Sequence, residues 1–130
     1  REGEQSDHPH HQSFWLAHGS VNGFDFWHGK GHRERVVQDA MYARVGHDPF
    51  ALVQCEYQWL VDDDTLVMRE SRQLRFRDVG DQRMIDVLVE FRAEADDVRF
   101  GDTKEGMFAL RVHPALRVSG EAANGSNHNH

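Results

Sequence analysis

The chain has 130 residues, enough for one domain that buries about two-thirds of its unfolded surface. Its 15 basic and 22 acidic residues give a net charge of −7, so binding to a nucleic-acid backbone is not expected. A single cysteine excludes an internal disulfide, and no apolar run reaches the ~18 residues of a membrane-spanning helix. The sequence begins with Arg1 rather than Met, so we leave the cellular compartment unknown.

Histidines and aromatic rings gather near the start of the chain, in residues 7–27 (DHPHHQSFWLAHGSVNGFDFW). Imidazoles exchange protons or bind metals near neutral pH, and planar aromatic rings form the walls of small-ligand sites. Pro9 fixes its own φ and disfavours helical geometry at His8. In the extended segment that this predicts, His8 and His10 point to one side and His11 to the other. We expect the stretch to form the floor of a ligand site.

Alternating apolar and polar residues predict long strands through the middle of the chain. The extended pattern covers residues 34–45, 53–61, 66–77 and 85–93, with a shorter strand over 108–112. Residues 62–65 and 79–82 supply turn chemistry between the long strands, which predicts an antiparallel meander. No helix longer than two turns is indicated. The predicted fold class is therefore all-β, an antiparallel β-sandwich or a large twisted sheet.

The predicted strand over residues 66–77 carries two charged residues, Glu70 and Arg72, among apolar side chains of one face. The apolar members of that face are Leu66, Met68, Leu74 and Phe76. We interpret Glu70 and Arg72 as a buried ion pair that fixes strand register, with the polar lining of a binding face as the alternative. Cys55 falls on the apolar face of its own strand, which indicates packing rather than nucleophilic catalysis.

A second chemistry-bearing stretch, residues 100–112 (FGDTKEGMFALRV), places two acids, a hydroxyl and an amine between two glycines. A surface turn is the simplest interpretation of the six residues GDTKEG. The aromatic residues Phe100 and Phe108 on either side suggest instead that the loop is held against a sheet. In that case Glu105 or Asp102 contributes to the site, and Arg111 can bind a carboxylate or sugar hydroxyls through its planar fork.

Together, residues 7–27 and 100–112 resemble the two signature segments of the PmoA-type family, bacterial soluble proteins that carry the label "methane oxygenase PmoA". The resemblance covers residues 7–118 and implies a partial supersandwich similar to galactose mutarotases, whose members bind or modify carbohydrates. We expect residues 1–120 to form a single β domain that is part of a longer domain. The polar composition of residues 121–130 predicts a disordered tail. At Gln12 and Ser20 the chain departs from the family pattern, so no role is carried over to them.

The resemblance implies acid–base chemistry on a sugar. An imidazole of His11 or His10 protonates the ring oxygen, and Glu105 removes a proton from the anomeric hydroxyl. The substrate-binding candidates are His18, Trp27, Asp102 and Arg111. The predicted partner is a small carbohydrate ligand, with no nucleic acid and no membrane span in this chain.

Two further functions remain open from the sequence. One is a non-catalytic carbohydrate-binding module that uses the same sheet. The other is a metal-dependent oxygenase, as the family label suggests, with His8 and His10 as weak candidate ligands of a divalent ion and His18 or Asp25 as a third. No HExxH or comparable spacing supports that ion, so we predict no cofactor. The motifs of serine hydrolases, NTPases and dinucleotide-binding proteins are absent.

Overall fold

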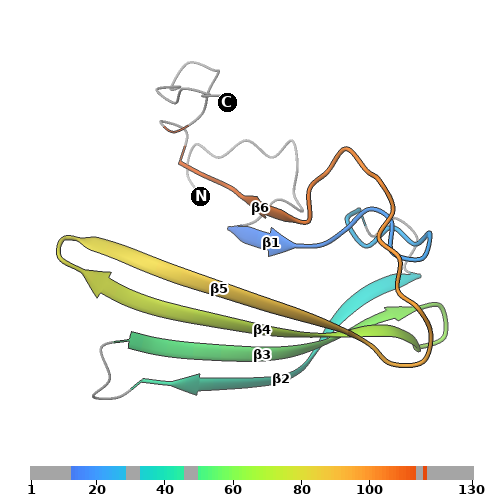
Figure 1. The fold of residues 1–130 in the computed structure, drawn as a ribbon, viewed down its shortest axis with the longest axis horizontal. Coiled ribbons are helices and arrows are strands. Elements are labelled where there is room, and N and C mark those ends of the chain that lie inside the picture. Colours follow the sequence, from blue (N-terminus) through green and yellow to red (C-terminus); the bar gives the residue numbers. More distant parts are fainter. Residues whose placement is uncertain (1–12, 29–32, 46–49, 114–115, 117–130) are drawn as a thin grey trace. The chain divides into compact units, whose positions relative to one another are not determined.

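The computed structural model describes residues 13–28, 33–45, 50–113 and 116, and these residues are almost entirely strand and turn (Figure 1). The six strands are β1 (Phe14–Leu16), β2 (Glu34–Arg44), β3 (Phe50–Val61), β4 (Thr65–Val79), β5 (Gln82–Ala93) and β6 (Phe108–Leu110). They form two antiparallel sheets, β1-β6 and β2-β3-β4-β5. The all-β, antiparallel fold class is confirmed, and antiparallel sheets are the components of a β-sandwich.

The chain divides into two compact units, which we describe separately. Unit 1 comprises residues 1–18 and 104–130 and holds the sheet β1-β6. Unit 2 comprises residues 19–103 and holds the sheet β2-β3-β4-β5. In the described part of the chain, no helix has the length and apolar character needed to cross a membrane.

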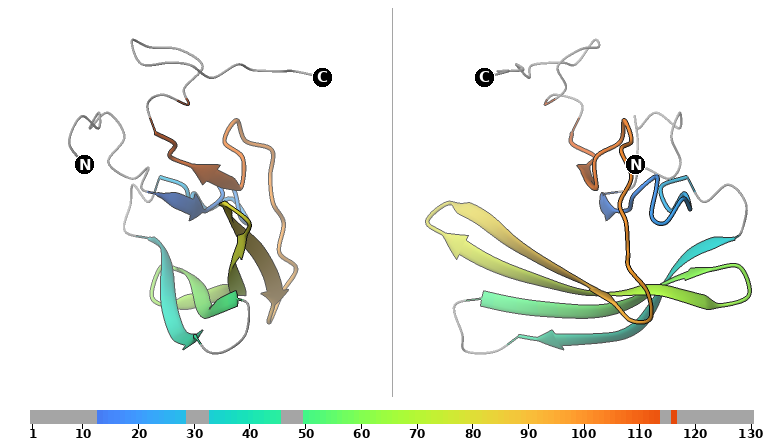
Figure 2. Two further views of the ribbon diagram at one scale, coloured as in Figure 1. Left: turned by 90° about the vertical axis from the view of Figure 1, so that its left-hand side faces the viewer. Right: turned by 45° about the vertical axis from the view of Figure 1, so that its right-hand side comes forward.

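The four-stranded sheet of unit 2 is the predicted meander, in which each strand pairs with the next along the chain (Figure 1). Figure 2 shows its twist from two further sides, as expected from the right-handed twist of individual strands. Gly80 adopts a φ of 64° in the turn between β4 and β5. Asp62 and Asp64 adopt φ values of 46° and 64° between β3 and β4, a left-handed conformation that short polar side chains tolerate better than most. The turn predictions at 62–65 and 79–82 are confirmed.

A β-bulge corrects the predicted face of Leu66. Trp59 pairs with Met68, but the next residue of β3, Leu60, pairs with Leu66, so Val67 is the extra residue of β4. As a result Val67 and Met68 both lie in the buried core. Leu66 pairs with Leu60 and lies with it on the opposite face of the sheet. The strict period of two that predicted Leu66 on the face of Met68 does not continue through the bulge.

Beyond the bulge, the two faces of the sheet differ in polarity as the alternation predicted. One face carries Tyr57 and Trp59 of β3, Glu70 and Arg72 of β4, and Ile85, Val87, Val89 and Phe91 of β5. The other is largely polar, and there Glu56 accepts hydrogen bonds of 3.0 Å from both Gln54 and Ser71. Such one-sided polarity is typical of antiparallel sheets.

The core of unit 2 forms where residues 21–26 pack on the β3–β4 end of this sheet. Its buried members are Val21, Phe26, Trp59, Val61, Val67 and Met68, with Phe24, Phe91 and Val98 packed at its margin. The rings of Phe26 and Trp59 lie 4.8 Å apart, and those of Trp59 and Phe91 meet edge to face at 5.7 Å. Edge-to-face aromatic pairs add about 0.5–1.5 kcal/mol beyond the area that they bury. The core therefore anchors residues 21–26 to the sheet.

Unit 1 is built on a short pair of strands. Phe14 pairs with Leu110 and Leu16 with Phe108, and the rings of Phe14 and Phe108 lie 5.8 Å apart. The sequence predicted a strand near residues 108–112, which in the structure ends at Leu110, but it did not predict its partner β1. In a three-residue strand the alternation of apolar and polar residues is too short to be recognised in the sequence, so such strands are identified only by their pairing in the structure.

A candidate ligand-binding groove

The two stretches that the sequence analysis singled out are antiparallel partners in both units. In unit 1 they pair through β1 and β6, and the N–H of Ala17 donates to the carbonyl of Met107 at 3.1 Å. In unit 2 the N–H of Gly101 donates to the carbonyl of Ser20 at 2.8 Å, and Val21 bridges Phe100. Segments 79 to 96 residues apart in sequence are thus brought side by side by backbone hydrogen bonds.

The first of these segments turns sharply at Asn22 and Gly23, whose φ values are 51° and 83°. Positive φ at both central residues defines a type I′ turn, for which Asn-Gly is the preferred sequence. Val21 and Phe24 flank the turn and exchange backbone hydrogen bonds of 2.9 and 3.0 Å. The turn is exposed at its tip and is anchored by the buried side chain of Val21.

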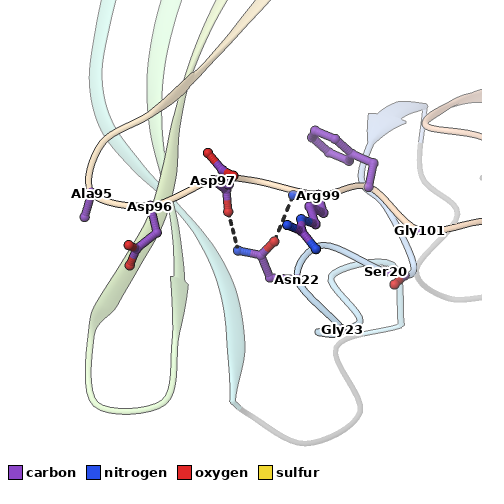
Figure 3. Close-up of a pocket in the computed structure, with 9 residues that line it drawn as sticks. Ser20, Asn22, Gly23, Ala95, Asp96, Asp97, Arg99 and Gly101 are labelled. Carbon is purple, nitrogen blue, oxygen red and sulfur yellow. Dashed lines mark hydrogen bonds between the residues drawn. The ribbon is translucent and has the colours of Figure 1, made fainter.

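The side chain of Asn22 attaches this turn to residues 97–99, which directly precede the second stretch (Figure 3). Its amide N–H donates to the carbonyl of Asp97 at 3.2 Å, and its amide oxygen accepts from the backbone N–H of Arg99 at 2.8 Å. The backbone N–H of Asn22 also donates to the carbonyl of Arg99, at 2.9 Å. One asparagine therefore fixes the backbone over Asp97 to Arg99, which leaves the side chains of both residues exposed.

An open groove of about 1020 Å³ lies where the turn meets residues 95–101. It is lined by Ser20, Asn22, Gly23, Ala95, Asp96, Asp97, Arg99, Phe100 and Gly101, all within unit 2. The lining combines two carboxylates, a guanidinium, a hydroxyl and one aromatic ring. Phe100 is 40% exposed, and its ring centroid lies 5.7 Å from that of Phe91. The groove thus offers both hydrogen-bonding groups and a flat apolar surface.

The width of the groove at Ser20 depends on a glycine. A Cβ atom added at Gly101 would lie 2.5 Å from the Ser20 hydroxyl oxygen and 3.0 Å from its Cβ atom. A Cβ atom added at Gly19 would lie 3.3 Å from Thr103. Contacts this close require the neighbouring side chain to move, so Gly101 permits the close approach of the two segments. Gly101 is therefore needed for steric reasons, whereas the sequence analysis interpreted it as a turn residue.

Next to the groove-forming turn, Asp25 organises a second tight turn. Its carboxylate accepts from the backbone N–H groups of Trp27 at 3.0 Å and His28 at 3.1 Å, and it lies 2.8 Å from Nδ1 of His28. Burial would raise the pKa of Asp25, but the hydrogen bonds from His28 and Trp27 outweigh burial and hold the pKa below its ordinary value. The carboxylate of Asp25 is therefore held by the backbone and the imidazole of its own turn.

The predicted site residues fall in different parts of the chain. His8, His10 and His11 lie outside the described residues. Trp27 and Asp102 belong to unit 2, where Trp27 is half-buried and Asp102 is exposed, and neither lines the groove.

His18, Glu105 and Arg111 belong to unit 1. His18 is buried, and the carboxylate of Glu105 is 18% exposed and lies 3.3 Å from the ammonium group of Lys104. The backbone N–H of Arg111 donates to the carbonyl of Ser13 at 2.7 Å. Within the described ranges, no three His, Cys, Asp or Glu side chains are arranged to hold a metal ion.

Sequence analysis missed most of the groove. Asp96 and Asp97 follow the predicted strand over residues 85–93 and, like Asn22, Arg99 and Ser20, were given no binding function. The dipeptide Asn22-Gly23 was the available signal, because Asn-Gly between apolar residues is a strong indicator of a two-residue hairpin. The pairing of that hairpin with residues 97–101 follows from tertiary structure alone.

Comparison with known proteins gives one match. The profile of a family of unknown function, DUF6807, matches residues 1–130, which is the whole chain. No curated protein and no solved structure matches.

Proposed function

Because this chain belongs to DUF6807, a family of unknown function, we propose its function from its own chemistry: unit 2 binds a carbohydrate in the groove between Asn22 and residues 95–101. The observation that carries the proposal is the composition of the groove lining. Carboxylates and a guanidinium bond neighbouring hydroxyls in pairs, and an exposed ring packs against the C–H face of a sugar. The open form suits a ligand that stays partly solvated.

Each group that lines the groove has a different proposed role in binding. Asp96 and Asp97 accept hydrogen bonds from sugar hydroxyls, and Arg99 donates to ring or hydroxyl oxygens. Phe100 supplies the apolar platform, and its contact with Phe91 ties that platform to the core margin. Since Asn22 holds the backbone at Asp97 and Arg99, these two binding groups are positioned before the ligand arrives. The resemblance to PmoA-type and mutarotase-like proteins points to the same ligand class.

Titration of the full chain with a panel of mono- and oligosaccharides tests the proposal, with backbone amide NMR shifts as the readout. The expected result is saturable shifts confined to residues 20–23 and 95–101. Phe100→Ala and Asp97→Asn should each weaken binding about tenfold, the equivalent of ~1.4 kcal/mol. Matched controls are Leu88→Ala and Asp81→Asn, which change an exposed apolar and an exposed acidic residue on β5 and its turn. Absence of binding across the panel, or equal effects of controls and groove variants, would reject the proposal.

We propose a catalytic function separately for unit 1, namely acid–base exchange at the anomeric carbon of a sugar, with Glu105 as base and His10 or His11 as acid. The half-buried carboxylate of Glu105 in unit 1 supports the assignment of the base. Saturation-transfer NMR of aldose anomers measures the exchange directly. A catalyst should accelerate it, and Glu105→Gln should abolish the acceleration while sugar binding in the groove persists. Binding with no acceleration would identify a non-catalytic binding protein.

A further inference from the structure

Two strands of unit 2, β2 and β5, form the open edges of its sheet, and no further strand pairs with either within the described ranges. The two edges differ in regularity. The register of β2 with β3 is interrupted between Gln38 and Ala40, whereas β5 pairs with β4 without interruption from Gln82 to Ala93. Bulges blunt the edges of natural sheets against further pairing. The edge at β5 lacks that protection.

The side chains of β5 also favour association. On its apolar face Ile85, Val87, Val89, Phe91 and Ala93 follow one another without a charged residue. Ile85 is 50% exposed and Val87 is 38% exposed. Edge strands are commonly protected by charges that point to the apolar side, or by proline, and β5 contains no proline. Its one charge on the apolar side, Arg83, lies at the start of the strand, where it pairs with Asp78 at 3.2 Å. The other three charged residues, Asp86, Glu90 and Arg92, lie on the polar face.

We propose that two copies of this chain associate through antiparallel pairing of their β5 strands, with Val89 at the two-fold axis. In such an isologous pair, opposed residues must lie on the same face of the joined sheet. With Val89 opposite itself, Asp86 of each protomer lies opposite Arg92 of the other. Within its own chain Asp86 also contacts Arg77 at 3.1 Å and Arg92 contacts Glu94 at 2.6 Å, so the four side chains form a network of alternating charge at each end of the pair. Val87 then lies opposite Phe91, which joins the apolar faces, and Glu90 lies opposite Leu88.

Neighbouring registers lack this charge complementarity or shorten the paired region. Centring the pair on Leu88 places Asp86 opposite Glu90, and centring it on Glu90 or on Asp86 places that acid opposite its own copy. Centring it on Val87 leaves Asp86 opposite Leu88, with no ion pair. Centring it on Phe91 places Glu90 opposite Arg92, but because β5 ends at Ala93 only residues 89–93 then overlap, against 85–93 in the register centred on Val89. Like charges directly opposed on adjacent strands destabilise a sheet, and opposite charges stabilise it. Charge pattern and length of overlap together therefore favour the register centred on Val89.

Sedimentation velocity over a concentration series tests the proposal on the full chain. The expected result is a reversible monomer–dimer equilibrium that Val87→Lys shifts to monomer. Val36→Lys is the matched control, because Val36 lies on the same face of the opposite edge and is 37% exposed. Thermal unfolding of both variants checks that they are folded. Monomer at every concentration, open-ended oligomers, or equal effects of the two variants would overturn the proposal.

Charge exchange and cross-linking test the register. Asp86→Arg and Arg92→Asp should each weaken self-association about tenfold, and an equimolar mixture of the two variants should form a heterodimer. In the mixed dimer every position 86 faces an opposite charge at position 92, while the contacts of Arg77 and Glu94 within each chain are the same as in the separate variants. Val89→Cys should form a disulfide-linked dimer on oxidation, whereas Val87→Cys should not, because only residue 89 lies opposite its own copy. The native Cys55 is buried and is common to both variants. Linkage through residue 87 but not 89, or no heterodimer in the mixture, would overturn the proposed register.

Discussion

The indole N–H of Trp59 donates a hydrogen bond of 2.9 Å to the carboxylate of Glu70, and both side chains are completely buried. The other carboxylate oxygen accepts from Arg72 at 2.6 Å, and the guanidinium of Arg72 lies 4.8 Å from the ring centroid of Tyr57. A buried carboxylate is tolerated only where donors replace its lost hydration. Here all the donors come from β3 and β4 themselves, so the cluster is consistent with the predicted function of fixing strand register.

Loss of one member of this cluster is expected to destabilise the chain strongly. Glu70→Leu leaves the Arg72 guanidinium, 13% exposed, without its carboxylate and should lower the free energy of unfolding by about 3–5 kcal/mol. The double variant Glu70→Leu/Arg72→Met should recover part of that loss, because an apolar pair replaces the ion pair while the buried Trp59 indole N–H stays without its acceptor. Urea unfolding of wild type, both single variants and the double variant measures the coupling. Simple additivity of the two single effects would contradict this account.

Substitution of Gly101, at the point where the stretch 100–112 approaches Ser20, should destabilise the protein for steric reasons. Gly101→Ala places a Cβ atom 2.5 Å from the Ser20 hydroxyl and should cost about 1–3 kcal/mol of stability. The companion change Ser20→Gly should restore most of it, since it removes the clashing atoms. Gly106→Ala is the control, because a Cβ atom there meets nothing closer than the Phe108 carbonyl at 4.0 Å. Equal loss in both alanine variants, measured by thermal unfolding, would disprove the steric explanation.

The turn at Asp25 should loosen in acid. Because the pKa of Asp25 is lower in the folded protein than in the unfolded chain, its contribution to stability is complete above the ordinary carboxyl pKa. That contribution is lost as the pH falls through the lowered pKa. Amide NMR shifts of Trp27 and His28 followed from neutral pH into acid should report the transition. Asp25→Asn should remove it, and persistence of the same titration in that variant would assign it to another group.

Tyr57 should resist ionisation in alkali. Burial and its contact with the Cys55 thiol raise the pKa of Tyr57, against an opposing effect of Arg72. A raised pKa means that the neutral phenol is favoured in the folded state, so the associated stability is present below the ordinary pKa and is lost at higher pH. In the Tyr42→Phe variant, which leaves one tyrosine, phenolate absorbance should appear only above pH ~10. An ordinary titration in the folded variant would contradict the burial of this hydroxyl.

Much of unit 2 follows from local sequence. Regular alternation predicted β3, β4 and β5 because their period of two persists over many residues, and acidic or glycine-rich turns separate them. The ion pair of Glu70 and Arg72 was also predictable, because two opposite charges on an otherwise apolar face must compensate each other when buried. The bulge at Val67 was not, since an extra residue changes the side of each later side chain and leaves no compositional signal.

What the sequence by itself determined is the all-β class, the meander of β2 to β5 and the two stretches rich in chemical groups. Each depends on patterns within a few residues, where side-chain alternation and turn propensity act. Only the tertiary structure decided that those two stretches pair with each other, that Asn22 holds Asp97 and Arg99 in place, and that the groove is lined by residues with no motif of their own. Backbone hydrogen bonds between residues so far apart carry no sequence signature, because the backbone groups that form them are the same in almost every residue.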